Sequence, residues 1–133
     1  MKKFLIVICL LSACTLIAAD KKSVDVSKLP PASDKKGVTY DKDIKPIFQK
    51  SCFKCHGPEK QKAKLRLDSL AAALKGSENG KVIEVGDSAK SILIHNVAHI
   101  GEEDDWMPPP DKGDPLTKEQ ISLLRAWIDQ GAK

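Results

Sequence analysis

A chain of 133 residues with a formal net charge of +4 has room for one small domain. Loss of Lys2 and Lys3 with an N-terminal targeting segment lowers this charge to +2, and the other lysines are interspersed with Asp and Glu, which argues against a nucleic-acid-binding face. Two of the four cysteines lie within the first 14 residues, so too few remain for a disulfide framework.

Residues 1–19 have the pattern of a signal peptide, with two basic residues followed by an apolar run, residues 4–11, that is too short to span a bilayer as a helix. Two cleavage sites fit this segment. Residues 11–14, Leu-Ser-Ala-Cys, resemble a lipobox that would leave Cys14 as a lipidated N-terminus, whereas residues 17–19, Ile-Ala-Ala, form an ordinary small-residue site before Asp20. Either site predicts an exported, periplasmic protein, and the first predicts a lipoprotein anchored to the membrane.

Residues 20–37 are rich in Lys, Ser, Asp and Pro and show no apolar periodicity. We therefore expect a flexible tether there, with an average reach of roughly 25 Å. The folded domain is predicted to comprise residues 38–133.

The first predicted helix has one apolar face, formed by Ile44, Ile47, Phe48 and Cys52. This spacing is helical and brings the C-terminal end of the helix to Cys52. Asp41 or Asp43 is available as the N-cap, and Pro46 fits only in the first turn.

Two short helices follow, each with residues typical of helix ends. One is predicted over Asp68–Lys75, closed by Gly76, and the other over Ser88–Ala98, opened by Asp87 or Ser88. The intervening segments, residues 57–67, 77–86 and 101–115, are rich in Gly, Pro and charge and are predicted to be loops.

The last helix has the strongest signals in the chain. Thr117 and Gln120 match a capping box, and Gly131 suits the position after the helix end. Its apolar stripe consists of Ile121, Leu124, Trp127 and Ile128. The predicted fold is all-α, and so much loop around about four helices leaves a thin core that needs another apolar surface to pack on.

Residues 52–56, Cys-Phe-Lys-Cys-His, form the c-type haem attachment motif. Two thiols at this spacing can each add to one vinyl group of a single porphyrin, and the adjacent histidine is then brought to the iron. A chance occurrence is expected on the order of once per thousand chains of this size. The motif predicts one covalent haem c held by Cys52 and Cys55, with His56 as the proximal iron ligand.

The sixth iron position has three candidates. Met107 is the only methionine outside the signal peptide, and the three prolines after it restrict the backbone beside its sulfur, which favours it as the distal ligand. His95 and His99 lie four residues apart on a predicted helix face and compete for the position, although an apolar stripe already accounts for the buried side of that helix. Their role stays open at this point.

The chain from Tyr40 to Ala132 resembles the small c-type cytochrome domain common in Planctomycetes and Verrucomicrobia. The matching stretches are residues 43–48, 52–58, 65–69, 104–109, 116–120 and 127–132. The resemblance implies a cytochrome c-like fold around one covalent haem, with Cys52 and Cys55 as attachment sites, His56 proximal and Met107 distal. It also implies packing of Phe48 on Trp127 beside the haem edge. With both axial positions filled, we expect an electron carrier and not an enzyme.

The same residues are also compatible with functions other than electron transfer by a bound haem. Cys52, Cys55, His95 and His99 are together a Cys₂His₂ set for zinc, although the gap between the two pairs is far longer than in a zinc finger. A thiol redox module lacks the expected βαβ pattern. A haem enzyme or sensor would result if the distal position were open. An electron carrier needs redox partner proteins, and the acidic residues 102–105 are our candidate for selecting them.

Overall fold

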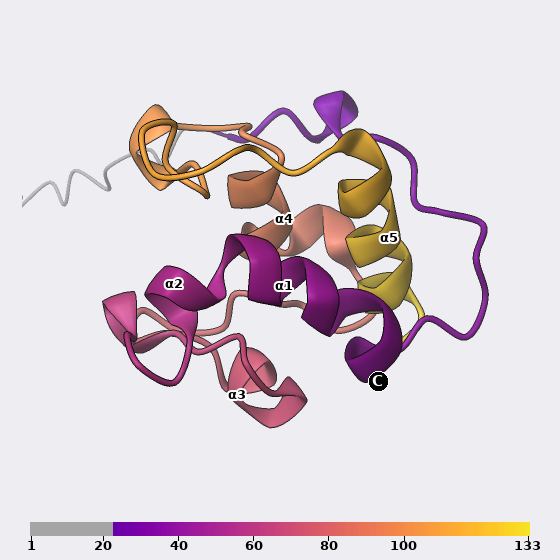
Figure 1. Ribbon diagram of the computed structural model, residues 1–133. Helices are drawn as coiled ribbons and strands as arrows, with labels where there is room; N and C mark the ends of the chain where they lie inside the picture. Colours follow the sequence, from indigo (N-terminus) through magenta and orange to yellow (C-terminus); the bar gives the residue numbers. More distant parts are fainter. Residues whose placement is uncertain (1–22) are drawn as a thin grey trace, which may run out of the picture.

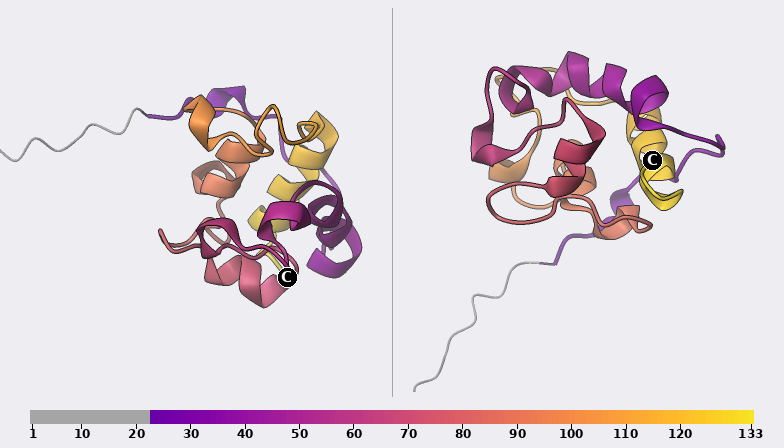
Figure 2. Two further views of the ribbon diagram at one scale, coloured as in Figure 1. Left: turned by 60° about the vertical axis from the view of Figure 1, so that its left-hand side comes forward. Right: turned by 90° about the horizontal axis from the view of Figure 1, so that it is seen from below.

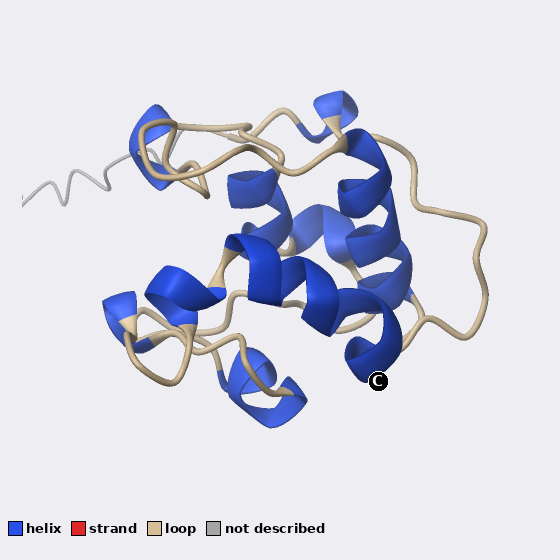
Figure 3. Ribbon diagram, viewed as in Figure 1, coloured by secondary structure: helices blue, strands red, loops and turns tan. Residues whose placement is uncertain are grey.

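The computed structural model describes residues 23–133 (Figure 1). These residues form helices and loops, and no β-strand occurs among them (Figure 3), which confirms the predicted all-α class. No helix within this part of the chain is long and apolar enough to cross a membrane. The predicted signal peptide, both of its cleavage sites and Cys14 lie outside the described residues.

Five α-helices and several shorter helical turns build the fold of residues 23–133. The α-helices are α1 (Lys45–Ser51), α2 (Phe53–His56), α3 (Leu70–Lys75), α4 (Ile92–Val97) and α5 (Lys118–Asp129). A π-helical turn, Tyr40–Ile44, leads into α1, and 3₁₀ turns lie at Val26–Lys28, Lys62–Lys64, Ser88–Lys90 and Glu103–Asp105.

The start of the first helix differs from the prediction. Thr39 is the N-cap of the π-helical turn, and neither Asp41 nor Asp43 caps a helix end. The Asp43 carboxylate instead accepts a hydrogen bond from the Thr39 backbone N–H, at 2.9 Å, and pairs with Lys35. The N-cap prediction was wrong because the helical chain begins earlier than the apolar periodicity suggests. Pro46 lies in the first turn of α1, as predicted.

The helices α3 and α5 agree closely with the sequence. Ser69 caps α3, and Gly76 follows its end with a φ of +87°. In α5 the Thr117 hydroxyl accepts from the backbone N–H of Gln120, whose side-chain oxygen accepts from the backbone N–H of Thr117, so the predicted capping box is confirmed.

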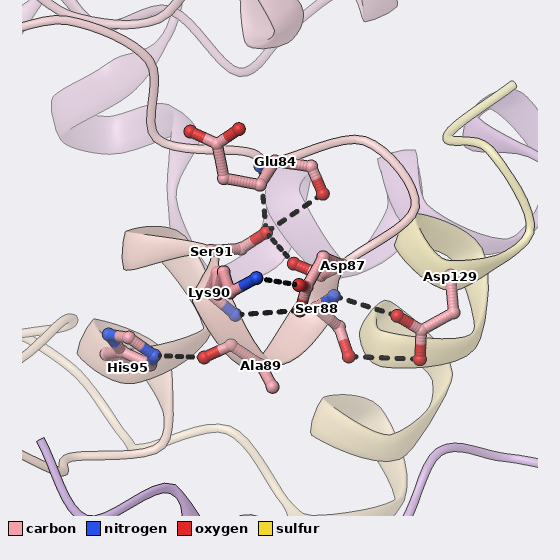
Figure 4. A network of polar contacts seen from close by, with 8 residues as sticks. All are labelled: Glu84, Asp87, Ser88, Ala89, Lys90, Ser91, His95 and Asp129. Atoms are coloured by element: carbon pink, nitrogen blue, oxygen red, sulfur yellow. Dashed lines mark hydrogen bonds and ion pairs between the residues drawn. The ribbon is translucent and has the colours of Figure 1, made fainter.

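The helix predicted over Ser88–Ala98 is divided in the structure. A 3₁₀ turn capped by Asp87 comes first, and α4 begins only after Ser91, which has an extended backbone. The Ser91 hydroxyl donates to the Asp87 carbonyl and accepts from the Glu84 backbone N–H, each at 2.9 Å (Figure 4). A serine whose hydroxyl bonds to backbone groups of another segment competes with helix continuation.

An aromatic core, defined here as Tyr40, Phe48 and Trp127, joins α1 to α5 (Figure 1). The rings of Phe48 and Trp127 meet edge to face, with centroids 6.3 Å apart and planes inclined by 81°. The Tyr40 ring contacts both, and its hydroxyl donates to the buried Leu67 carbonyl at 2.7 Å. The predicted packing of Phe48 on Trp127 is confirmed. The apolar periodicity did not predict Tyr40 as part of this core.

The segment of residues 23–37, predicted as part of a flexible tether, is bonded to the domain. The backbone N–H of Ser33 donates to the Ser122 carbonyl at 2.9 Å, and the guanidinium of Arg125 donates to the Pro30 carbonyl. Leu29 is buried in the core. The segment therefore runs along α5 (Figures 1 and 2). Its polar composition does not reveal this, because backbone groups make most of the bonds.

Candidate functional site

The motif of residues 52–56 forms one helical turn at the end of α1. The backbone N–H of Cys52 donates to the Phe48 carbonyl at 2.7 Å, and the N–H groups of Cys55 and His56 both donate to the Cys52 carbonyl, at 3.0 and 2.8 Å. Residues three apart in a helical turn share a face, so the two cysteines point to the same side of α2. The aromatic core fixes α1, and α1 in turn positions the motif.

Gly57 ends this turn, and no larger residue fits there. A Cβ atom at this position would lie 2.4 Å from the Phe53 carbonyl oxygen. The chain can therefore turn back immediately after His56, and the backbone N–H of Gly57 donates to the Lys60 carbonyl at 2.8 Å. Gly57 was not among the predicted site residues, although a glycine directly after the motif is a signal for a tight turn.

A cavity beside α2 has a volume of about 440 Å³. Its lining contains all four of the predicted site residues, Cys52, Cys55, His56 and Met107. The volume lies within the range of roughly 300–1,000 Å³ that is usual for small-molecule and cofactor sites. Pro108 and Pro109 form part of the same wall. The fold thus brings Met107, from the loop before α5, to the helical turn that carries the cysteines and the histidine.

His56 has the environment expected of a metal-binding imidazole. Burial lowers its pKa, and the neighbouring backbone of Leu65 and Lys62 partly opposes this effect, so the ring is neutral at neutral pH. The neutral imidazole is the form that binds a metal. Its Nδ1 atom is buried without a hydrogen-bond partner. An imidazole and a thioether, beside two thiols in one apolar-walled cavity, fit a covalently attached haem.

The two cysteines are free thiols, and Cys52 is buried. Burial and, secondarily, the proximity of Cys55 raise the pKa of Cys52 to about 12. Redox-active cysteine pairs usually contain a thiol with a lowered pKa. The burial and raised pKa of Cys52 are therefore unlike those of an attacking redox thiol.

The two other histidines lie away from the cavity lining. The Nε2 atom of His95 is 2.6 Å from the Ala89 carbonyl oxygen (Figure 4). The His99 ring stacks on Trp106, with centroids 4.9 Å apart and planes inclined by 9°, and its Nε2 atom lies 3.2 Å from the Met107 carbonyl oxygen. Of the three candidates for the distal position, Met107 alone lines the cavity.

The zinc interpretation required both histidines to meet both cysteines. Among residues 23–133, no three or more His, Cys, Asp or Glu side chains are grouped so that they could hold a metal ion. The Cys₂His₂ alternative was wrong because the His95 ring bonds to Ala89, in the turn before α4, and the His99 ring bonds to Met107.

Positive charge surrounds the cavity. Its lining includes five lysines, Lys50, Lys54, Lys60, Lys62 and Lys112. Asp114 is the one acidic residue of the lining, and Lys112 is paired with the neighbouring Asp111 at 3.0 Å. The acidic residues 102–105 are exposed and take no part in the lining.

A small helical fold with a Cys-x-x-Cys-His turn and a methionine on one cavity has the organisation of a c-type cytochrome. Residues 52–111 match the family model described as Planctomycete cytochrome C, which confirms the resemblance seen in the sequence. The family indicates a c-type cytochrome, which carries covalent haem c and generally serves as an electron carrier. A search of curated proteins and a search of solved structures each found no match.

Proposed function

We propose that the protein is an exported, single-haem cytochrome that transfers electrons, with haem bound through Cys52 and Cys55 and its iron held by His56 and Met107. The observation that carries this proposal is the meeting of these four side chains on one cavity of about 440 Å³. The described chain has one attachment motif and no further cysteines, which favours a single haem.

Both axial ligands come from the chain, which favours electron transfer over the binding of a small ligand. A bound haem supplies an iron that changes between the ferric and ferrous states. The imidazole of His56 and the thioether of Met107 would leave that iron no open position, and distal access decides between electron transfer and ligand activation. An enzyme or sensor function requires Met107 to leave the iron.

The lysines of the cavity lining support a redox partner with an acidic docking face. Complementary charge raises the rate of association and is screened by salt. We therefore expect the rate of electron transfer to acidic partners to fall as ionic strength rises. The acidic residues 102–105, away from the lining, remain a candidate for selecting partners of the opposite charge. We further propose a periplasmic location, with a lipid anchor at Cys14 if cleavage occurs before that residue.

The test is the absorption spectrum of the protein after export in a host that attaches haem. We expect a sharp α-band in the reduced protein and pigment that survives both denaturation and acid–acetone extraction. The double variant Cys52→Ser, Cys55→Ser should retain almost no pigment. Equal amounts of tightly held pigment in the variant and the wild type would contradict covalent attachment, and a colourless wild type that releases zinc in acid would favour a zinc protein.

The same preparation tests the distal ligand. Thioether ligation gives the oxidised protein a weak charge-transfer band at the red end of the spectrum, and Met107→Ala should abolish it. The reduction potential should fall as well, because a methionine ligand raises it. His95→Phe is a matched control, since His95 was a candidate for the distal position but lies away from the cavity lining. Loss of the band in this control alone would contradict the assignment of Met107.

A further inference from the structure

The backbone around Met107 is held on both sides by the end of helix α4. The Met107 N–H donates to the Asn96 carbonyl at 2.9 Å, and the Met107 carbonyl oxygen lies 3.2 Å from Nε2 of His99. Pro108 has no N–H group, so this carbonyl is the one strong hydrogen-bonding group of the peptide unit between Met107 and Pro108. The contact with His99 therefore fixes a peptide unit that has no other polar means of attachment.

The chemistry of this contact determines which partner donates. A carbonyl oxygen only accepts, so Nε2 of His99 must carry the hydrogen. The same imidazole stacks on the indole of Trp106, with centroids 4.9 Å apart. One side chain thus holds two consecutive residues of the loop, the side chain of Trp106 and the backbone of Met107.

His99 is a histidine at a backbone position where glycine is usual, which independently indicates a role for its side chain. Ala98 is the C-cap of α4, and His99 follows it with a φ of +53°. Glycine is the usual residue at this position because a Cβ atom disfavours the left-handed conformation. The Ile100 N–H donates to the His95 carbonyl and closes the turn through the backbone, so the helix end does not require a histidine.

We propose that His99 is a positioning residue, which holds the loop so that the sulfur of Met107 stays at the cavity. This inference rests on the proposed function, in which that sulfur binds the haem iron. The sulfur can leave the iron only if the loop moves, and the bond between His99 and the loop resists this movement. Loss of the bond should therefore make the iron more accessible to a competing ligand.

The experiment measures how tightly free imidazole binds to the pigmented, oxidised protein, followed by loss of the charge-transfer band. His99→Phe keeps a ring that can stack on Trp106 but cannot donate to the Met107 carbonyl. We expect it to bind imidazole about five- to tenfold more tightly than the wild type, which corresponds to one lost hydrogen bond. His99→Gln retains an N–H donor and should restore at least part of the wild-type affinity.

Two further variants protect this test against a general loss of structure. His99→Gly removes both contacts while favouring the positive φ, so it should fold and should bind imidazole at least as tightly as His99→Phe. His95→Phe is the matched control, because the His95 ring bonds to Ala89 (Figure 4) whereas the His99 ring bonds to Met107, and its imidazole affinity should stay within twofold of the wild type.

The outcomes separate this proposal from the proposed function. A wild-type protein without the charge-transfer band, whose imidazole affinity is unchanged by Met107→Ala, would overturn ligation by Met107 and the role of His99 with it. A wild-type protein with the band, but with equal imidazole affinity in the wild type, His99→Phe and His99→Gly, would overturn the role of His99 alone. An equal rise in His95→Phe would also overturn it, since the effect would then be unspecific.

Discussion

The aromatic core and the cavity are neighbouring regions of the molecule that differ in how completely their buried polar atoms are hydrogen-bonded. In the core, the Tyr40 hydroxyl donates to the Leu67 carbonyl and the Trp127 indole N–H donates to the Lys133 carbonyl at 3.0 Å. The buried side-chain polar atoms without a partner, among residues 23–133, are Nδ1 of His56 and Nε1 of Trp106. His56 lines the cavity, and Trp106 precedes a residue that does.

The buried polar side chains of the aromatic core are paired within the chain, whereas His56 at the cavity has a buried polar atom without a partner. Helix α1 links the two regions, because Phe48 packs in the core and the next turn ends at Cys52. Unpaired buried polar groups are rare in folded proteins and cost free energy. Because His56 lines the cavity, its unpaired Nδ1 atom agrees with a bound group at this site.

Removal of the Trp127 side chain should destabilise the aromatic core more than any other substitution proposed here. Its side chain is fully buried against Tyr40 and Phe48, so Trp127→Ala should lower the free energy of unfolding by about 3–5 kcal/mol. Trp106→Ala is the control, since this indole is only partly buried, and it should cost less. Urea unfolding of the pigmented proteins measures both. A larger loss in Trp106→Ala would reverse the comparison between the two regions.

Removal of the Tyr40 hydroxyl tests the polar part of the core. Tyr40→Phe leaves the Leu67 carbonyl buried without its donor, which should cost about 1–2 kcal/mol at pH 8. Burial, followed by the negative charges of Asp68 and Asp41, raises the pKa of Tyr40 to about 12 from its ordinary value of 10.0. The hydroxyl therefore stabilises the fold fully below pH 10, and this stabilisation is lost as pH rises through about 12.

The difference in stability between wild type and Tyr40→Phe should thus shrink between pH 10 and 12, the window set by the two pKa values of Tyr40. Urea unfolding at pH 8 and at several values within this window provides the measurement. Other groups that titrate there, the lysines above all, are common to both proteins and cancel in the comparison. A difference that stays constant, or grows, with rising pH would contradict the role assigned to the hydroxyl.

The smallest expected effect comes from the capping box of α5, which lies outside both regions. Thr117→Ala removes the bond from the Gln120 backbone N–H and should cost about 1 kcal/mol. Thr39→Ala is the matched control, because Thr39 is also an N-cap but its side chain makes no capping bond. Thermal unfolding should show a lower midpoint for the first variant only. Equal shifts would mean that the capping bond has no measurable value.

The sequence predictions succeeded where the interacting residues are close in the sequence and failed where they are farther apart. The glycine that closes α3 and the capping box of α5 were predicted because these helix ends depend on residues within about one turn. The break at Ser91 was missed because its hydroxyl bonds to Glu84, in a segment that no local signal connects to it. The packing of residues 23–37 was missed for the same reason, since Ser33 pairs with Ser122.

The sequence by itself predicted the attachment motif and the resemblance to the matched family, because five adjacent residues contain the two thiols and the imidazole in a fixed order. It also determined the end of α3 and both ends of α5, which depend on contacts within one turn. Only the tertiary structure decided that Met107 lies at the cavity of Cys52 and His56, and that His99 is bonded to the Met107 backbone. These residues are distant in the sequence, and the path of the connecting loops depends on the packing of the whole domain.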